Sequence, residues 1–168
     1  HVNSHKDLPV YAYQIQNKFR NELRAKSGLM RGREFIMKDL YSFSRDEMEF
    51  KEFYEKCADA YMKIFTRVGI GDITYRTFAS GGSFSKFSDE FQTLSDAGED
   101  TIYIDKKKGV AVNKEVLESD ALKKMGINKK DLIEETSIEV GNIFKFGTSK
   151  SETLSALYKD EKGKELPI

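Results

Sequence analysis

The residues best suited to chemistry in this chain surround one loop between two runs of alternating apolar residues. Arg20 and Glu22 precede the loop, and Arg31 and Phe35 follow it. A guanidinium donates two parallel hydrogen bonds to a phosphate or carboxylate, so Arg20 and Arg31 could hold one anion if the two runs pair as antiparallel strands. Glu22 falls on the same strand face as Arg20, where it could accept from an amine or hold a water or a metal. Phe35 offers a ring on which a flat base could stack.

The segment around this loop is basic, whereas the charges of the whole chain balance at 28 basic and 28 acidic residues. It carries seven basic residues against three acidic ones: Lys18, Arg20, Arg24, Lys26, Arg31, Arg33 and Lys38 against Glu22, Glu34 and Asp39. Such a local patch suits polyphosphate or nucleic acid. The alternative interpretation is a solvated charged hairpin that binds nothing.

Alternation of apolar and polar residues predicts the two strands that position the loop. Residues 10–19 read as a half-buried strand, residues 23–29 as the loop, and residues 33–43 as the returning strand. Lys38 and Asp39 interrupt the second run, and we expect them to be a solvent-facing pair.

A helix is predicted after the second strand. Ser44 and Glu47 have the spacing of a capping box. Apolar and aromatic residues recur at helical spacing over residues 50–68, which predicts a helix whose aromatic stripe covers one face of a sheet. Cys57 lies on that apolar face and is expected to pack in the core. Gly69 begins a glycine pair that ends the helix.

The rest of the chain reads as short strands separated by turns. Strands are predicted at 74–79, 90–95, 101–104 and 138–146, short surface helices within 114–131, and a last hairpin from 154 onward. The lysines 106–108 form a basic tip that could touch RNA or merely keep a turn solvated. The simplest architecture is an α+β fold, an antiparallel β-sheet with helices on one side.

Length and composition restrict the class of protein. A chain of 168 residues, 39% hydrophobic and 33% charged, fits one soluble domain, and no run is apolar enough to cross a membrane. One cysteine excludes an internal disulfide and favours a reducing, cytoplasmic compartment. There is no Cys/His cluster, P-loop or dinucleotide fingerprint, so no protein metal site is predicted. Because the chain begins with His1 and ends as a strand begins, we expect it to be a piece of a longer polypeptide.

Several strings in the sequence resemble one family. Phe-Arg-x-Glu, a basic loop and Arg-x-Arg-Glu-Phe, within the run KDLPVYAYQIQNKFRNELRAKSGLMRGREFIMKDLYSF, resemble motif 2 of class II aminoacyl-tRNA synthetases, and the bacterial prolyl-tRNA synthetases in particular. GGSFS with DEFQTLSDAGEDT, then IEVGNIFKFGT and YKDEKGKELPI, follow in the family's order. The resemblance implies that residues 1–168 are part of a class II catalytic domain, with motif 2 at about 10–43.

The resemblance also implies roles for the loop residues. Arg20 would bridge the α-phosphate of ATP and the amino-acid carboxylate, and Arg31 would hold the outer phosphates. Glu22 would meet the adenine amino group, and Phe35 would stack under adenine. Mg²⁺ is the expected counter-ion of ATP.

A second set of residues is implied in the proline pocket: Gly81, Gly82, Ser83, Asp89 and Asn142. Gly81-Gly82-Ser83 would border the pocket, because glycine lets backbone approach a ligand closely, although the same residues could be a plain hairpin turn. At positions 89 and 142 the family commonly has histidine. Asp89 could pair with the prolyl iminium, or the change could weaken the pocket.

The activity implied is ATP-dependent activation of L-proline and its transfer to the 3′ end of tRNA(Pro). Arg24 and Lys26 would contact the tRNA acceptor end, and the parent enzyme would be a homodimer formed through parts outside this chain. Only a short stretch joins Asn113 to Ile138, so no editing insertion is expected there. Alone, the piece is expected to be inactive or nearly so.

Two alternatives remain open at this point. A non-catalytic synthetase-like paralogue could bind RNA or protein, which the Asp89 change favours and the complete motif 2 set disfavours. A threonyl or seryl enzyme would need different pocket chemistry, often a zinc site. Proline-dependent against threonine- or serine-dependent pyrophosphate exchange separates these readings.

Overall fold

The computed structural model describes residues 2–82, 87–118, 122 and 125–168 and divides into two units. The hairpin unit comprises His1–Phe50 with Ser151–Ile168, and the barrel unit comprises Lys51–Lys150. The strands lie in three sheets, two of two strands and one closed barrel of five. The α+β class is therefore as predicted, but the strands do not form the single antiparallel sheet that we expected.

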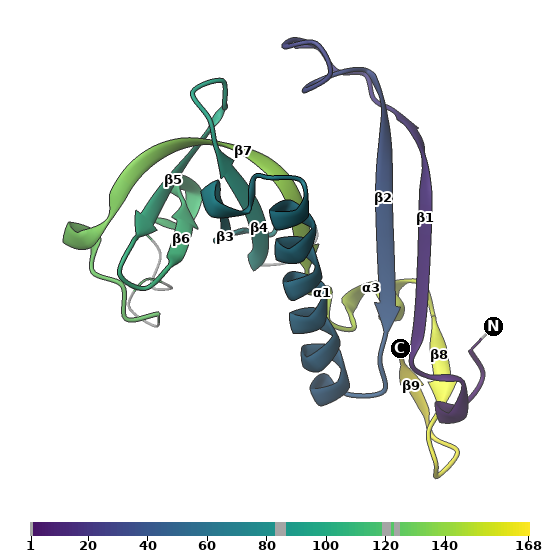
Figure 1. The fold of residues 1–168 in the computed structure, drawn as a ribbon. Helices are drawn as coiled ribbons and strands as arrows, with labels where there is room; N and C mark the ends of the chain where they lie inside the picture. Colours follow the sequence, from purple (N-terminus) through teal and green to yellow (C-terminus); the bar gives the residue numbers. More distant parts are fainter. Residues whose placement is uncertain (1, 83–86, 119–121, 123–124) are drawn as a thin grey trace. The chain divides into compact units, whose positions relative to one another are not determined.

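A long ribbon dominates the hairpin unit (Figure 1). Strands β1 (Val10–Phe19) and β2 (Glu34–Phe43) pair antiparallel along their whole length. Both predicted strands are confirmed. The expected half-burial of β1 is wrong, since Tyr13, Ile15 and Phe19 are 74%, 66% and 74% exposed. A two-stranded ribbon without a covering layer buries little side-chain surface.

A small hairpin completes this unit. Strands β8 (Leu157–Lys159) and β9 (Glu165–Pro167) pair antiparallel, as predicted, after the short helix α3 (Ser149–Thr153). The hairpin is tied to earlier parts of the unit: Lys159 N–H donates to the Asn3 carbonyl at 3.1 Å, and the Tyr158 hydroxyl donates to the Arg45 carbonyl at 3.3 Å.

The barrel unit closes five strands in the order β3-β4-β7-β5-β6. All neighbours are antiparallel except β3 and β6, which are parallel. The strands are β3 (Thr74–Ser80), β4 (Phe87–Leu94), β5 (Asp100–Asp105), β6 (Val110–Asn113) and β7 (Ile133–Phe144). Sequence reasoning missed β6, whose four residues are too few to show a period.

The predicted helices of 114–131 are shorter than expected in the part of the chain that the structure describes. Single 3₁₀ turns cover Lys114–Val116 and Lys129–Asp131, each capped by the side chain of the preceding asparagine. Residues 119–121 and 123–124 lie outside the described residues. The predicted short link between β6 and β7 is present, and β7 begins earlier than expected, at Ile133.

Helix α1 (Glu47–Arg67) packs its aromatic stripe against β4, as predicted. The Tyr61 ring stacks on Phe91 with centroids 4.8 Å apart, and Phe65 meets Phe91 at 5.7 Å. Phe91 is fully buried, whereas Ile64 and Val68, also assigned to the stripe, are 51% and 65% exposed. The core-facing stripe is therefore narrower than the run of apolar residues.

The helix begins two residues later than the predicted capping box. The Asp46 carboxylate accepts from Glu49 N–H at 2.8 Å, and the Glu49 carboxylate accepts from Arg45 N–H at 2.8 Å. Ser44 Oγ is buried and has no hydrogen-bond partner among the described residues. A carboxylate caps a helix about as well as a hydroxyl and in addition complements the helix dipole. The predicted glycine stop is confirmed, with Gly69 at φ +86°.

Candidate functional site

The predicted site lies at the open end of the β1–β2 ribbon, where pairing continues past both strands. Arg20 N–H donates to the Arg33 carbonyl at 2.9 Å, and Lys26 N–H donates to the Arg31 carbonyl at 3.1 Å. Arg20 and Arg31 are therefore on the two paired arms of one ribbon, as the sequence predicted. That both guanidinium groups meet one anion stays a prediction.

Two of the four predicted nucleotide-site residues are in contact. The Arg20 guanidinium carbon lies 5.2 Å from the centroid of the Phe35 ring, which is cation–π geometry. Both residues project from the same face of the ribbon, because Lys18 pairs with Phe35 and Arg20 lies two residues beyond Lys18. The structure thus places Arg20, which is expected to bind phosphate, beside Phe35, on whose ring the adenine base is expected to stack.

Glu22 shapes the loop. Its Oε1 accepts from Arg24 N–H at 2.9 Å, and its carbonyl accepts from Arg33 Nε at 3.0 Å. Arg33 was not a predicted site residue, although its place in Arg-x-Arg could have suggested that one arginine binds the loop itself. The loop mouth therefore has a fixed frame made of Glu22 and Arg33.

The tip of the loop faces solvent. Ser27 and Gly28 both have positive φ, +57° and +62°, and Met30 N–H donates to the Ser27 carbonyl at 3.2 Å. Arg24 and Lys26, the predicted contacts to the tRNA acceptor end, are both exposed. Exposure is what a contact to a large ligand requires, and their role stays a prediction.

On the face that leads to this mouth, Asp39 is engaged by other residues. Its carboxylate lies 3.1 Å from Lys18 Nζ and accepts from Gln14 Nε2 at 3.2 Å. Partial burial would raise the pKa of Asp39, but the bonds from Lys18 and Gln14 outweigh it and lower the pKa. The expected solvent-facing pair of Lys38 and Asp39 is wrong for Asp39, because strand alternation turns it to the face opposite Lys38.

The candidates for the proline pocket lie in the barrel unit. Gly81 is buried, and Gly82 has φ +56° with its N–H donating to Ser80 Oγ at 3.3 Å, so this segment is a tight turn after β3. A side chain at position 82 would be strained. Ser83 lies outside the described residues. The pocket role of these glycines stays a prediction.

Asp89 is held by its own protein neighbours. Its Oδ2 accepts from Arg76 Nη2 at 2.6 Å and from the Tyr54 hydroxyl at 2.9 Å. Arg76 also donates to both carboxylate oxygens of Glu55, at 2.6 and 3.0 Å. Burial, together with the Asp89 charge, raises the pKa of Tyr54. The hydroxyl therefore stays protonated and donates a hydrogen bond to Asp89. Sequence reasoning singled out Asp89 but missed Arg76.

Asn142 projects from the opposite face of the sheet. It pairs directly with Glu90 in the β4–β7 ladder, so both point to one side, and Asp89 points to the other. In this arrangement Asp89 and Asn142 do not line one pocket. Asn142 Oδ1 is buried without a hydrogen-bond partner in the described part of the chain.

Glu90 is a buried carboxyl that sequence reasoning did not single out. Its Oε2 accepts from Gln92 Nε2 at 2.9 Å and from Asn113 Nδ2 at 3.0 Å. Ser137 in turn donates to Gln92 Oε1 at 2.9 Å. Burial raises the pKa of Glu90. The barrel core therefore contains a polar cluster of these side chains in addition to an apolar cluster of Ile102, Ile104 and Ala111.

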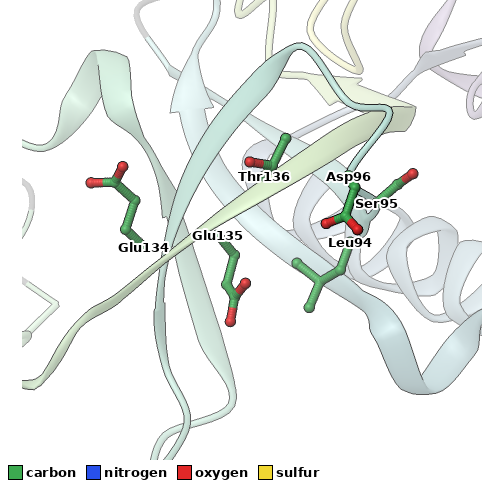
Figure 2. Close-up of a pocket in the computed structure, with 6 residues that line it drawn as sticks. All are labelled: Leu94, Ser95, Asp96, Glu134, Glu135 and Thr136. Atoms are coloured by element: carbon green, nitrogen blue, oxygen red, sulfur yellow. The ribbon is translucent and has the colours of Figure 1, made fainter.

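A separate cavity of about 390 Å³ opens at another end of the barrel unit, where the end of β4 meets β7. Figure 2 shows its lining of Leu94, Ser95, Asp96, Glu134, Glu135 and Thr136, with Glu134 and Glu135 on opposite sides of β7. Three of the six residues are acidic. Such a lining repels phosphate, so this cavity does not suit ATP.

Within the described ranges, no group of three or more His, Cys, Asp or Glu side chains is placed to hold a metal ion. Among the described helices, none is long and apolar enough to cross a membrane. Glu22 is the one acidic residue among the predicted nucleotide-site residues.

The ribbon with its Arg-rich mouth defines a class. The chain belongs to the family of the class II tRNA synthetase core domain (G, H, P, S and T), whose model matches residues 1–167. Within that family it is similar to proline–tRNA ligases. It is 37% identical to that of Sulfurimonas denitrificans over 99% of this chain and 42% of the relative, and 36% identical to that of Rickettsia akari with the same coverage.

A solved structure agrees on the fold. Prolyl-tRNA synthetase from Cryptosporidium parvum, complexed with L-proline and AMP, matches with a TM-score of 0.65 at 14% identity, over 99% of this chain and 27% of that one. The predicted class II catalytic fold is confirmed. The chain spans less than half the length of these relatives, so their whole activity is not read from it directly.

Proposed function

We propose that this chain is the ATP-binding part of a proline–tRNA ligase, which activates L-proline with ATP and transfers it to tRNA(Pro). The observation that carries the proposal is Arg20 stacked on Phe35 at the mouth of a paired ribbon. Similarity to proline–tRNA ligases over 99% of this chain supports the choice of amino acid. Neither observation favours threonine or serine.

In the proposed reaction, the proline carboxylate attacks the α-phosphate of ATP, the bond from that phosphorus to the β-phosphate oxygen breaks, and pyrophosphate leaves. Negative charge builds on the transferring group in the process. Arg20 supplies the fixed positive charge and the planar fork that align the two anions. Since the Arg20 guanidinium lies over Phe35, it must share or leave that ring face when adenine stacks there. The hydrogen bonds of Glu22 and Arg33 keep the loop in shape around Arg20.

The remaining partners follow from the same proposal. Mg²⁺ would be held mainly by the phosphates of ATP, because Mg²⁺ commonly keeps several waters and uses one or two carboxylates. Glu22 is the nearest candidate ligand by position. The tRNA acceptor end would meet Arg24 and Lys26. A homodimer, a cytoplasmic setting and the lack of an editing insertion remain predictions.

The test is proline-dependent ATP–pyrophosphate exchange by the full-length product of the gene that encodes this chain. We expect Arg20→Lys to lower kcat by about 10²- to 10³-fold, because lysine keeps the charge and loses the fork. We expect Phe35→Leu to raise the KM for ATP about tenfold, since stacking on a base is worth about 1–3 kcal/mol.

Arg67→Lys is the matched control, since Arg67 is exposed on α1. It should leave exchange unchanged. Exchange driven by threonine or serine instead of proline would contradict the proposal, and so would an Arg20→Lys enzyme within threefold of the wild type.

A further inference from the structure

Two lysine-bearing segments meet at one end of the barrel unit. The β5–β6 turn carries Lys106 and Lys107, and the 3₁₀ turn before β7 carries Lys130. Ile104 pairs with Ile133, so the end of β5 lies beside the start of β7. Lys108 Nζ, in the β5–β6 turn, donates to the carbonyl of Gly126, which precedes the 3₁₀ turn by three residues.

The lysines at this end are not balanced by equal numbers of facing carboxylates. Lys106, Lys107 and Lys130 are exposed, and none of them makes an ion pair within the described part of the chain. Lys129 does, with Glu118 at 2.6 Å. We call Lys106, Lys107 and Lys130 the lysine surface.

Two carboxylates adjacent to these lysines in the sequence, Asp105 and Asp131, do not cancel the charge of this surface. Asp105 is 4% exposed, and its Oδ1 accepts from the N–H groups of Lys107 and Lys108 at 3.0 and 3.1 Å. It therefore holds the turn from beneath while the lysine side chains project outward. Asp131 is exposed beside Lys130 and offsets one charge.

We propose that the lysine surface binds the phosphodiester backbone of tRNA, in addition to the loop between β1 and β2. The proposal rests on the proposed function, which makes tRNA the polyanion that this chain meets. Lysine ammonium groups on flexible stems suit rows of phosphates, whose contacts position an RNA without reading its bases. A stable protein partner would instead need an apolar centre, which adjacent lysines do not offer.

The experiment measures binding of unmodified tRNA to the 168-residue chain by fluorescence anisotropy over a series of salt concentrations. The variant is Lys106→Gln with Lys107→Gln and Lys130→Gln. Removing one lysine–phosphate pair lowers the magnitude of the slope of log K against log salt by about 0.7 to 0.9. We expect the slope to fall by about 2 and the affinity at low salt to fall at least about tenfold.

The matched control removes three exposed charges elsewhere on the same unit: Lys56→Gln with Lys63→Gln and Arg67→Gln on α1. It changes net charge equally and should leave the slope near that of the wild type. Circular dichroism and a thermal melt check that both variants fold.

An equal fall in slope in the two variants would overturn the proposal, because it would show that only net charge matters. Competition by polyglutamate as strong as that by tRNA, at equal charge, would also overturn it. Proline-dependent pyrophosphate exchange needs no tRNA, so it should be unchanged when the three lysine substitutions are made in the full-length product of the gene. Failure of the proposed function would abolish exchange in the full-length wild type, which is a different result.

Discussion

At the scale of single residues, Arg76 in the barrel unit contacts three other side chains. It joins Asp89 on the neighbouring strand to Glu55 on α1 and lies 5.8 Å over the Tyr54 ring. The hydrogen bonds to Glu55, followed by those to Asp89, raise the pKa of Arg76, so it is always charged. Asp89 therefore already has a counter-ion within the protein, and its pairing with a prolyl iminium stays a prediction.

Arg76→Leu should lower the free energy of unfolding by about 1–3 kcal/mol, because it leaves the half-buried Asp89 carboxylate without its cation. Glu55→Gln is the control: the Glu55 side chain is 61% exposed, so its loss should cost less than about 0.5 kcal/mol. Urea unfolding followed by circular dichroism measures both. Equal effects of the two substitutions would argue against a special role for the Asp89 pair.

Glu90 makes the stability of the barrel unit depend on pH. Burial raises its pKa, and the nearby Asp100 and Glu115 charges raise it further, while Gln92 and Asn113 lower it. The folded chain therefore holds this proton more tightly than the unfolded chain. The stabilisation is complete below the ordinary value of 4.5 and is lost as pH rises through the raised pKa.

Glu90→Gln should remove the loss of stability that occurs as the pH rises. Its amide oxygen can still accept from Gln92 and Asn113, and its N–H₂ can donate to the unpaired Asn142 Oδ1 that faces it, as far as the described residues show. We expect a higher Tm at about pH 8 and a flatter dependence of Tm on pH between about 5 and 8. Glu52→Gln, an exposed position on α1, should change neither. A Glu90→Gln protein as pH-sensitive as the wild type would refute this account.

Sequence reasoning found part of the residue-level picture. Arg20 and Phe35 were predicted together because both lie beside one loop, and the register of β1 and β2 then puts them on one face of the ribbon. Arg76 could not be found in that way, since it is a lone arginine in a short strand. Its partner Asp89 is thirteen positions away, and only the β3–β4 register brings the two together.

At the scale of elements, α1 shows that a run of apolar residues at helical spacing can include more residues than the helix buries. Its aromatic residues meet the strands around Phe91 and, through the Tyr54 hydroxyl, at Asp89. Gly141 on β7 leaves room for the Tyr61 ring. A Cβ at position 141 would lie 3.0 Å from Tyr61 Cε1. Ile64 and Val68 lie outside this contact and face solvent.

Phe65→Ala should therefore destabilise the chain by about 3–5 kcal/mol, the usual cost of removing a buried phenyl ring. Ile64→Ala, on the adjacent exposed position, should change stability by less than about 0.5 kcal/mol. Thermal melts of the two single variants provide the comparison. Similar losses at the two positions would mean that α1 packs through a different face.

The strand pair β1–β2 was predicted to within a residue, because ten-residue alternation and turn residues agree there. The longer barrel strands were found, whereas β6 was missed although it carries two valines, because its four residues are too few to show a period. Burial was not predictable for β1, because alternation shows which residues share a face and not whether anything covers that face.

At the scale of the whole molecule, barrel closure is the feature that sequence could not provide. Four of the five barrel strands were recognised from the sequence, but a flat sheet and a closed barrel have the same period. The parallel contact of β3 with β6, through Thr77 with Ala111 and Phe78 with Val112, closes the ring. Closure leaves no free edge among the described barrel strands.

Residues 51–150 alone should therefore fold cooperatively, since the barrel pairs its own strands and carries most of α1. Residues 1–50 alone should not, because an isolated two-stranded ribbon is marginal in water. A sigmoidal urea transition for the first fragment and a featureless one for the second are the expected results. A non-cooperative 51–150 fragment would show that the barrel depends on the rest of the chain.

The bare face of the β1–β2 ribbon has a practical consequence for anyone handling this chain. One face of the ribbon carries four apolar side chains that are each at least 66% exposed: Tyr13, Ile15, Phe19 and Ile36. Among the described residues, no further strand pairs with the outer edge of β1 or of β2. We therefore expect copies of the chain to associate through this face at high concentration. Mild detergent or a glutamate in place of Ile15 or Ile36 should keep preparations clear.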